Sequence, residues 1–334
     1  MSQPLTPYTA DPQRYQGRDY RRAGRNGLLL PALSLGLWHN FGDDTPLTRQ
    51  RNILRTAFDH GITHFDLANN YGVPYGSAES NLGRLLRQDF GAHRDELIIS
   101  TKAGWDMWPG PYGQGGSSRK YLLASLDQSL ARLGLDYVDV FYSHRFDPDT
   151  PLEETADALA SVVRQGKALY VGISSYSAQQ ADEIAVLLNE RQVPLVLQQP
   201  LYNLLDRSIE TNGVLQGAQD RGAGVISFSP LAQGLLSGKY AHGIPADSRI
   251  GKGSRYLPEQ ALNDSLHTRI QSFENVATRR GQTLSQLALS WTLRDPRITS
   301  VLVGVSTPEQ LIENLQALTN LEFTAEELAQ LADT

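Results

Sequence analysis

The chain has 334 residues and a formal net charge of −6 at pH 7, with 40% hydrophobic and 20% charged residues. This composition is typical of a globular protein, and its acidic balance argues against a nucleic-acid-binding protein, which needs basic surface. Because the chain contains no cysteine, disulfides, thiolate metal sites and cysteine nucleophiles are excluded.

The N-terminal residues 1–18 are polar, contain prolines and lack the apolar segment of a signal peptide. No run of about 18 apolar residues occurs, which argues against membrane insertion. We therefore expect a cytoplasmic protein in which residues 1–18 form a flexible arm and residues 19–334 form a single domain. A homo-oligomer is compatible with this composition.

A β-hairpin is predicted first, from residues 20–22 and 28–31 joined through Gly24 and Gly27. After it come eight short runs that are too uniformly apolar for a half-exposed antiparallel sheet. These runs lie at 33–36, 62–67, 96–101, 137–143, 169–173, 193–197, 224–228 and 299–303.

Amphipathic helical patterns alternate with these runs, around residues 53–58, 122–133, 152–162, 181–188 and 311–318. Residues 307–310 (Thr-Pro-Glu-Gln) predict a capping box with proline at the first helical position. Strands buried on both faces and alternating with helices indicate a parallel sheet. Eight such units predict an α/β fold, a closed (β/α)8 TIM barrel, which typically needs about 250 residues.

Two long loops interrupt the pattern. Residues 103–118 carry Trp105, Trp108 and Tyr112, which either line a substrate pocket or pack as a plug over the barrel. Residues 232–258 carry a local net charge of +3 and form either a functional loop or an ordinary solvated one.

Four polar residues follow strand-like runs at positions where parallel strands would bring them to one rim: Asp66, Tyr71, Lys102 and His144. Barrel enzymes place catalytic groups at the C-terminal ends of their strands. A lysine ammonium beside a tyrosine favours the tyrosinate, an aspartate keeps the lysine charged, and a histidine can orient a carbonyl oxygen. Together they would supply a proton to an oxygen that gains charge as hydride reaches carbon.

Each of these residues also has an ordinary structural explanation. A tyrosine near a strand end is usually a core residue, a lysine usually faces solvent, and an aspartate commonly caps the next helix. Other chemistries have less support: the scattered histidines suggest no metal site, and no Gly-x-Ser-x-Gly nucleophile motif occurs. No Gly-x-Gly-x-x-Gly opens a helix after a first strand, so barrel loops would have to hold any nicotinamide cofactor.

The loop at 304–306 and the helix that begins at Pro308 offer backbone N–H groups and a positive dipole end for a phosphate. Ordinary helix capping would explain the same residues. Lys239 and Arg249 of the basic loop would be placed to bind a pyrophosphate or a 2′-phosphate.

In order along the chain, several segments resemble the aldo-keto reductase family, and the resemblance covers residues 18–332. These segments are 33–38, 61–72, 100–102, 172–175, 228–234, 237–240 and 303–306. The chain most resembles the branch that holds potassium-channel β-subunits and bacterial L-glyceraldehyde 3-phosphate (methylglyoxal) reductases. Residues 38–42 and 108–113 are similar to the bacterial reductases.

The resemblance implies a catalytic tetrad of Asp66, Tyr71, Lys102 and His144, with Tyr71 as the proton donor, and NADPH/NADP+ as cofactor. It also implies a set of cofactor-binding residues and no metal. These residues are Trp38, Asp66, Ser174, Gln199, Phe228, Ser229, Leu231, Gln233, Lys239, Arg249, Gly304, Ser306, Gln310, Glu313 and Asn314. Channel subunits tend to have an arginine where this chain has Ser175, and asparagine where it has His144.

We therefore expect an NADPH-dependent reductase that converts small aldehydes, such as L-glyceraldehyde 3-phosphate or methylglyoxal, to alcohols. One alternative is an NADP-binding regulatory β-type subunit of a membrane channel with weak reductase activity. A metal-dependent barrel hydrolase or isomerase is a third hypothesis.

Overall fold

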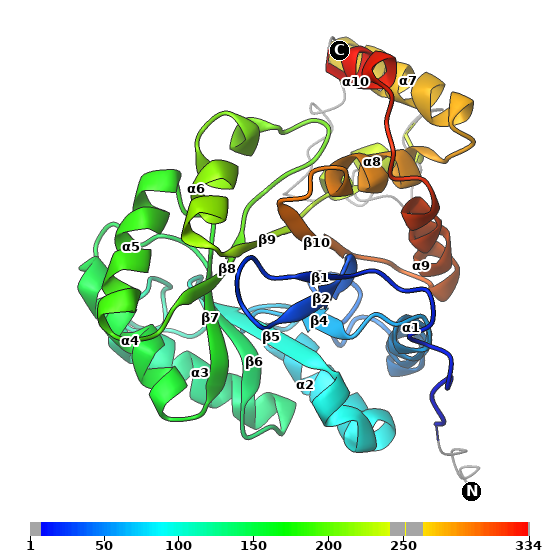
Figure 1. Cartoon of the computed structure of the whole chain (residues 1–334). Helices are drawn as coiled ribbons and strands as arrows, with labels where there is room; N and C mark the ends of the chain where they lie inside the picture. The colour runs from blue at the N-terminus through cyan, green and yellow to red at the C-terminus, as the bar shows by residue number, and fades with distance from the viewer. Residues whose placement is uncertain (1–7, 241–250, 252–262, 333–334) are drawn as a thin grey trace, which may run out of the picture.

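The computed structural model of the chain describes residues 8–240, 251 and 263–332. Eight parallel strands form a closed barrel in the order β10-β3-β4-β5-β6-β7-β8-β9, with helices around it (Figure 1). The (β/α)8 barrel predicted from the sequence is therefore confirmed. The strands are β3 (Leu33–Gly36), β4 (His64–Asp66), β5 (Ile98–Ala103), β6 (Val138–Ser143), β7 (Ala168–Ser174), β8 (Leu195–Gln199), β9 (Gly224–Ser227) and β10 (Ile298–Val303).

The helices bury apolar faces against the outside of the barrel. The third ends where Gly134 adopts a left-handed conformation with φ 66°, as its sequence pattern predicts. The described helices are α1 (Leu47–Asp59), α2 (Ser77–Leu85), α3 (Arg119–Leu133), α4 (Leu152–Arg164), α5 (Ala178–Glu190), α6 (Val214–Arg221), α7 (Asp264–Arg279), α8 (Leu284–Leu293), α9 (Pro308–Leu315) and α10 (Ala325–Ala332).

A β-hairpin lies across one end of the barrel, as predicted, and forms its floor (Figure 1). Its strands β1 (Tyr20–Arg22) and β2 (Leu29–Pro31) pair antiparallel. Leu28 and Leu30 of the hairpin belong to one buried cluster with Val140, Leu197 and Ile226 from three barrel strands. The hairpin thus completes the apolar core inside the barrel.

Residues 8–18 contact the outside of the barrel near α1. The Tyr8 hydroxyl donates to Asp59 at 2.6 Å, and the Arg14 guanidinium pairs with Glu96 at 2.5 Å and lies 4.9 Å from the Phe58 ring. The first seven residues of the predicted arm lie outside the described residues.

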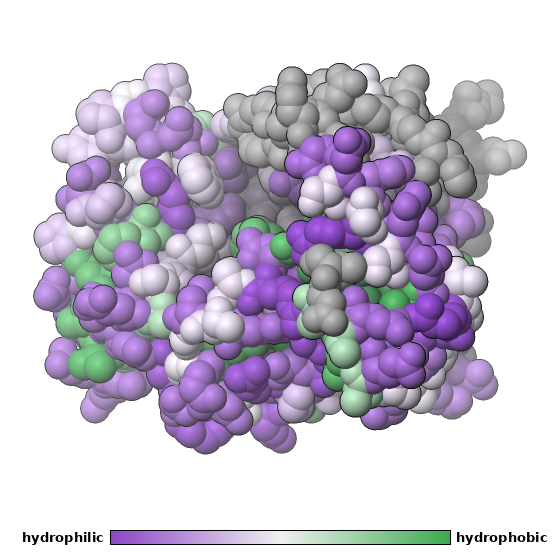
Figure 2. All heavy atoms as spheres, turned by 90° about the horizontal axis from the view of Figure 1, so that it is seen from above, coloured by the Kyte–Doolittle hydropathy of each residue, from purple (hydrophilic) through white to green (hydrophobic). Residues whose placement is uncertain are grey.

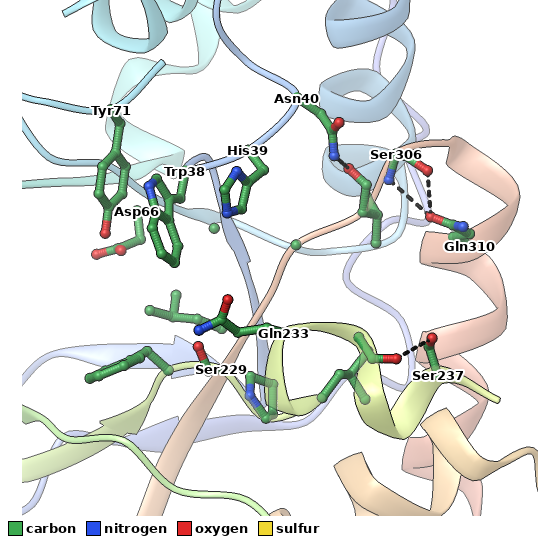
Figure 3. Close-up of a pocket in the computed structure, with 18 of the residues that line it drawn as sticks. Trp38, His39, Asn40, Asp66, Tyr71, Ser229, Gln233, Ser237, Ser306 and Gln310 are labelled. Carbon is green, nitrogen blue, oxygen red and sulfur yellow. Dashed lines mark hydrogen bonds between the residues drawn. The ribbon is translucent and has the colours of Figure 1, made fainter. Parts of the chain in front are cut away.

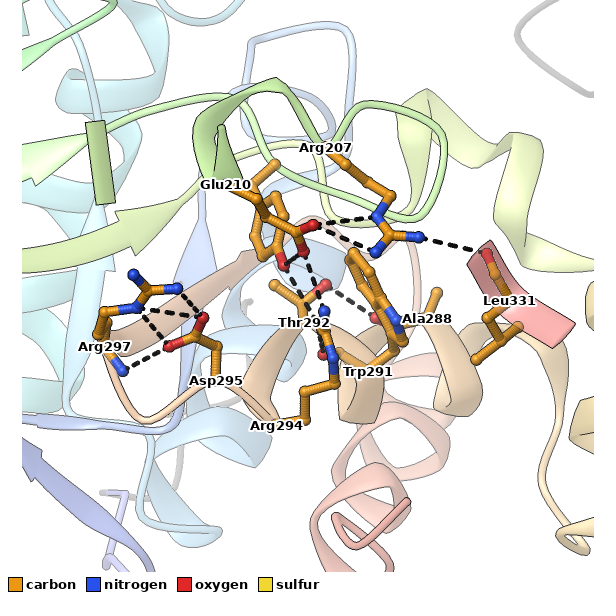
Figure 4. Close-up of polar contacts among 10 residues, drawn as sticks. Arg207, Glu210, Ala288, Trp291, Thr292, Arg294, Asp295, Arg297 and Leu331 are labelled. Atoms are coloured by element: carbon orange, nitrogen blue, oxygen red, sulfur yellow. Dashed lines mark hydrogen bonds and ion pairs between the residues drawn. The ribbon is translucent and has the colours of Figure 1, made fainter. Parts of the chain in front are cut away.

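Figure 4 shows a polar network that joins the segment after β8 to the C-terminal helices. Glu210 accepts from Arg294 at 2.9 Å and from Arg207 at 3.1 Å, and it also accepts from the Tyr202 hydroxyl. The Trp291 ring lies between the two guanidinium groups, 3.8 Å from Arg294 and 5.0 Å from Arg207. This packing fixes α8 (Leu284–Leu293) against the barrel, beneath the loops that form the pocket described below.

The face in Figure 2 is mainly hydrophilic, with small hydrophobic patches between polar residues. Among the helices that the structure describes, none has the length and apolar character needed to cross a membrane.

The hairpin turn approaches the barrel closely enough to exclude a side chain at one position. Gly24 has φ +56°, and a Cβ added there would lie 2.2 Å from the carbonyl oxygen of Gly222. We expect Gly24→Ala to lower the free energy of unfolding by about 2–4 kcal/mol, from backbone strain and a steric clash. Urea denaturation would measure the change.

Gly27→Ala is the matched control in the same hairpin, because a Cβ at Gly27 meets nothing within 4 Å. It should change stability by no more than about 0.5 kcal/mol. Equal stability of the two variants would contradict the role of Gly24 in seating the floor.

Candidate active site

Asp66 and Lys102 form a buried ion pair at the C-terminal ends of β4 and β5. These strands are parallel neighbours, and Asp66 is paired in register with Ser100, two residues before Lys102. The Lys102 ammonium donates to Asp66 Oδ2, and to the carbonyl oxygen of Leu67 at 2.7 Å. Asp66 Oδ1 accepts from the Ser100 hydroxyl at 2.6 Å and from the Gln199 amide at 3.3 Å. The carboxylate therefore accepts hydrogen bonds from three donors.

Tyr71 and His144 lie beside this ion pair. The Lys102 ammonium is 5.1 Å from the centroid of the Tyr71 ring, and the His144 ring centroid is 5.9 Å from that of Tyr71. Trp38 stacks on the other side of Tyr71 at 6.0 Å. In Figure 3 the hydroxyl end of Tyr71 points toward Asp66. The structure thus brings all four predicted rim residues together.

The environment of each group determines its proton affinity. Burial and the negative charge of Asp66 hold the pKa of Tyr71 well above its ordinary value of 10.0. Burial and the positive charges of Lys102 and Arg145 hold the pKa of His144 well below 6.5. Burial lowers the pKa of Lys102, although the charge of Asp66 opposes this shift. Tyr71 is therefore protonated and His144 neutral at pH 7.

The direction for Tyr71 differs from the sequence-based expectation that Lys102 lowers the pKa of the phenol. In the folded protein the ammonium is neutralised by Asp66, so the desolvation of the tyrosine dominates. A high pKa suits a group that must hold its proton until a basic oxygen is formed.

A cavity of about 980 Å³ opens above these residues, and its walls come from distant parts of the chain (Figure 3). Trp38 and Tyr71 lie on one side, Ser229 and Gln233 face them, and Ser306 lies toward the far end. All the predicted cofactor-binding residues line this cavity except Arg249, which lies outside the described residues. Lys102 lies behind Asp66, outside the lining.

The corner at α9 (Pro308–Leu315) corrects one prediction. Thr307 caps the helix by accepting from the Gln310 backbone at 3.3 Å. The Gln310 side chain does not return to Thr307, as a capping box requires, but accepts from the backbone and hydroxyl of Ser306, both at 2.9 Å. The predicted capping box is therefore wrong, because Gln310 instead fixes the loop that faces the cavity.

Backbone conformations that side-chain-bearing residues rarely adopt cluster along the cavity. Ser229 has φ 53°, Ala232 φ 46° and Gln233 φ 58°, while Asn40 and Ser175 elsewhere on the lining have φ 67° and 58°. Such conformations cost about 1–3 kcal/mol each and concentrate at functional sites.

The three aromatic residues of the loop at 103–118 have different surroundings. Trp105 lines the cavity, with the Arg145 guanidinium 4.6 Å from its ring. Trp108 instead stacks on the buried Tyr121 at 5.1 Å and anchors the loop. Tyr112 is exposed.

Sequence reasoning missed several residues of the site. Asn40 lines the cavity and donates to the carbonyl oxygen of Val305 at 3.1 Å, and Asn70, Arg49 and Asp106 also line it. A line of buried polar groups beneath Asp66 was missed as well. Their only signal was the appearance of serine and histidine within otherwise apolar strand segments.

Among the residues that the structure describes, no group of three or more His, Asp or Glu side chains could hold a metal ion. Three buried polar atoms at the cavity have no hydrogen-bond partner in this part of the chain: His144 Nδ1, Asn70 Oδ1 and Gln233 Oε1. Buried polar groups are normally hydrogen-bonded, so these atoms suit a polar ligand.

Comparison with known proteins shows which family the sequence matches. A sequence profile described as "Aldo/keto reductase family" matches residues 32–334. A protein named L-glyceraldehyde 3-phosphate reductase from Escherichia coli O157:H7 is 61% identical over 327 residues, covering 97% of this chain and 94% of the relative. Its counterpart from Escherichia coli strain K12 is 60% identical over the same length, with the same coverage.

A more distant relative is named "Probable voltage-gated potassium channel subunit beta" and comes from Oryza sativa subsp. japonica. It is 38% identical over 306 residues, which cover 90% of this chain and 90% of the relative.

Proposed function

The chain belongs to the aldo/keto reductase family, and we propose on this premise that it reduces small aldehydes with NADPH, using Tyr71 as the proton donor. The observation that carries the proposal is the grouping of a protonated tyrosine, a buried lysine–aspartate pair and a neutral histidine at one end of a 980 Å³ cavity. L-Glyceraldehyde 3-phosphate and methylglyoxal are the proposed substrates, because relatives with about 60% identity are named as reductases of the first of these two compounds.

The lining of the cavity fits a nicotinamide dinucleotide. Ser174 and Gln199 lie near Asp66 and offer a hydroxyl and an amide for a carboxamide. Ser306, Gln310 and Asn314 offer polar groups for the other end, where Gly304 leaves the backbone accessible. Lys239 and Arg249 would supply positive charge to phosphates. When bound, the cofactor would supply the hydride for the carbonyl carbon.

Each residue of the rim has a distinct task in this proposal. The ammonium of Lys102 has three hydrogens, of which Asp66 and the Leu67 carbonyl use two. The third is available to the Tyr71 hydroxyl and stabilises the tyrosinate that forms when the proton leaves. Neutral His144 orients the substrate carbonyl beside Tyr71, and Trp38 and Trp105 exclude water from the aldehyde.

The channel-subunit alternative rests on relatives near 38% identity, whereas the reductases match at about 60% over nearly the same length. His144 also lies against Tyr71, where the proposed chemistry needs it. These observations favour an enzyme over a channel accessory protein.

Replacing the proton donor gives the first test of this function. Tyr71→Phe should lower kcat by about 100-fold or more, because general acid catalysis typically contributes a factor of this size. Steady-state reduction of an aldehyde, followed by NADPH absorbance, measures the loss. Tyr137→Phe is the control: Tyr137 is a partly buried residue beside Arg94, outside the cavity lining. Near-wild-type turnover of Tyr71→Phe would refute the donor role.

Cofactor preference gives a second test. NADPH should bind at least about tenfold more tightly than NADH, because a 2′-phosphate gains charge-assisted hydrogen bonds from basic residues. Lys239→Gln and Arg249→Ala should each weaken NADPH and change NADH binding less, as measured by fluorescence titration.

Lys167→Gln serves as the control, because Lys167 is paired with Asp127 outside the cavity lining. If Lys239→Gln or Arg249→Ala weakens both cofactors equally, that residue contacts the shared pyrophosphate rather than the 2′-phosphate. If NADH binds as tightly as NADPH to the unaltered protein, the proposed cofactor is wrong.

A further inference from the structure

Beneath Asp66, a continuous line of hydrogen bonds runs through the interior of the barrel to its floor. Four neighbouring strands each place one polar side chain in this line: Ser300 on β10, Ser34 on β3, His64 on β4 and Ser100 on β5. All four are fully buried. We refer to these four residues as the Ser–His column.

Five contacts join the column to the groups at its ends. The Ser300 hydroxyl donates to the carbonyl oxygen of Pro31 at 2.6 Å and lies 2.6 Å from the Ser34 hydroxyl. Ser34 lies 2.9 Å from His64 Nδ1, and His64 Nε2 lies 2.9 Å from the Ser100 hydroxyl. Ser100 then donates to Asp66 Oδ1 at 2.6 Å.

The number of hydrogens in the column is one fewer than the number of contacts. Three hydroxyls and a neutral imidazole provide one hydrogen each, whereas five contacts each require one. Both ends are acceptors only, since Pro31 contributes a carbonyl and Asp66 a carboxylate. One of the five contacts must therefore lack a hydrogen while His64 is neutral. Burial lowers the pKa of His64 to about 4, which keeps the ring neutral at pH 7.

The distances show which contact lacks the hydrogen. The three oxygen–oxygen contacts are 2.6 Å, a separation at which two oxygens need a hydrogen between them. Ser300 therefore donates to Pro31, and Ser34 donates to Ser300. Because the Ser34 hydrogen is used in this way, His64 must donate to Ser34 from Nδ1. The bare nitrogen is then Nε2, which faces Ser100.

The Ser100 hydroxyl consequently has one hydrogen and two acceptors, Asp66 Oδ1 at 2.6 Å and His64 Nε2 at 2.9 Å. The hydrogen points to Asp66 in this geometry, and the bare Nε2 draws it partly away from the carboxylate, so that more of the negative charge of Asp66 acts on Lys102. Without this pull from His64, the Ser100 hydroxyl donates fully to Asp66 and competes with Lys102 for the same carboxylate.

We propose that His64 is a positioning residue that strengthens the Asp66–Lys102 ion pair by competing with Asp66 for the hydrogen of Ser100. The column below it, down to the carbonyl oxygen of Pro31, holds the imidazole in the Nδ1–H form that makes this competition possible. The effect on catalysis rests on the proposed reductase activity, whereas the positions of the hydrogens do not.

The charged and titratable groups around the column are few. Asp66 on β4 and Lys102 on β5 act on His64 in opposite directions, and Ser34 and Ser300 on the other two strands carry no charge. Tyr142 on β6 has its ring 5.6 Å from the Lys102 ammonium, and Tyr71 lies above the ion pair. Glu79 of α2 adds a favourable charge to Lys102. His144 lies against Tyr71, and burial together with the charges of Lys102 and Arg145 lowers its pKa.

The test compares two substitutions that should act in opposite directions. Ser100→Ala removes a donor from Asp66 and so strengthens the attraction between Asp66 and Lys102. The alkaline limb of the pH profile of kcat/KM should therefore move to higher pH. His64→Leu leaves the Ser100 hydrogen entirely to Asp66 and should move that limb to lower pH. A shift of about half a pH unit in each direction is expected, which corresponds to part of one hydrogen bond to a charged group.

Ser290→Ala is the matched control, because Ser290 is a fully buried serine whose hydroxyl donates within α8 to Leu287. It should leave the pH profile in place. If the column had only a structural role, Ser100→Ala and His64→Leu would both lower stability or kcat, and they would not move the alkaline limb in opposite directions. Shifts in the same direction, or none, would overturn the proposal.

A second measurement needs neither activity nor a folded variant of His64. Imidazole ¹⁵N NMR of the complete wild-type chain, labelled at histidine, reports which ring nitrogens carry hydrogen. We expect one non-titrating ring at pH 7 with a protonated Nδ1 and a bare Nε2, and Ser100→Ala should perturb that Nε2 signal. Absence of such a ring refutes the proposal, even if the aldehyde assay succeeds. Its presence without reductase activity would refute the proposed function alone.

Discussion

The ion pair between Asp66 and Lys102 is the constraint on which the rest of the site depends. Both side chains are almost completely removed from water, and an isolated buried charge is very costly. The pair is tolerated because further hydrogen bonds support it: Ser100 and Gln199 donate to the carboxylate, and the ammonium also donates to the Leu67 carbonyl. Losing one partner of such a pair costs about 3–5 kcal/mol, so β4 and β5 must remain in register for both stability and chemistry.

The interior of the barrel has a polar side, which reaches this pair, and an apolar side. On one side, β10, β3, β4 and β5 contribute the Ser–His column, and on the other, Val140, Leu197 and Ile226 form an apolar cluster. The hairpin contributes to both sides, because Leu30 joins the cluster while the Pro31 carbonyl ends the column. The backbone of the hairpin at the floor of the barrel is thereby connected to Asp66 through the side chains of the Ser–His column.

The sequence predicted the barrel and the rim because both depend on local signals that the fold preserves. The predicted strand at 33–36 coincides with β3, and the polar residues at the C-terminal ends of β4, β5 and β6 meet as parallel topology requires. The Ser–His column was not predictable, since a serine in an apolar strand has no periodic signature and its partners come from four strands. The capping box failed for a related reason. The 307–310 pattern fits the motif, but Ser306 lies closer to the Gln310 amide in three dimensions.

The wall opposite Trp38 shows how the fold keeps an unfavourable backbone in place. Ser229, Ala232 and Gln233 all have positive φ, and each such residue costs about 1–3 kcal/mol. Local hydrogen bonds offset this cost: the Asn203 amide donates to the Ser229 carbonyl at 3.0 Å, and the Ser237 hydroxyl donates to the Gly234 carbonyl at 2.6 Å. Because these contacts lie within the protein, the wall has its shape before any ligand binds. A ligand that enters the cavity therefore does not have to supply the ordering energy of this segment, and its interactions can contribute to affinity and orientation.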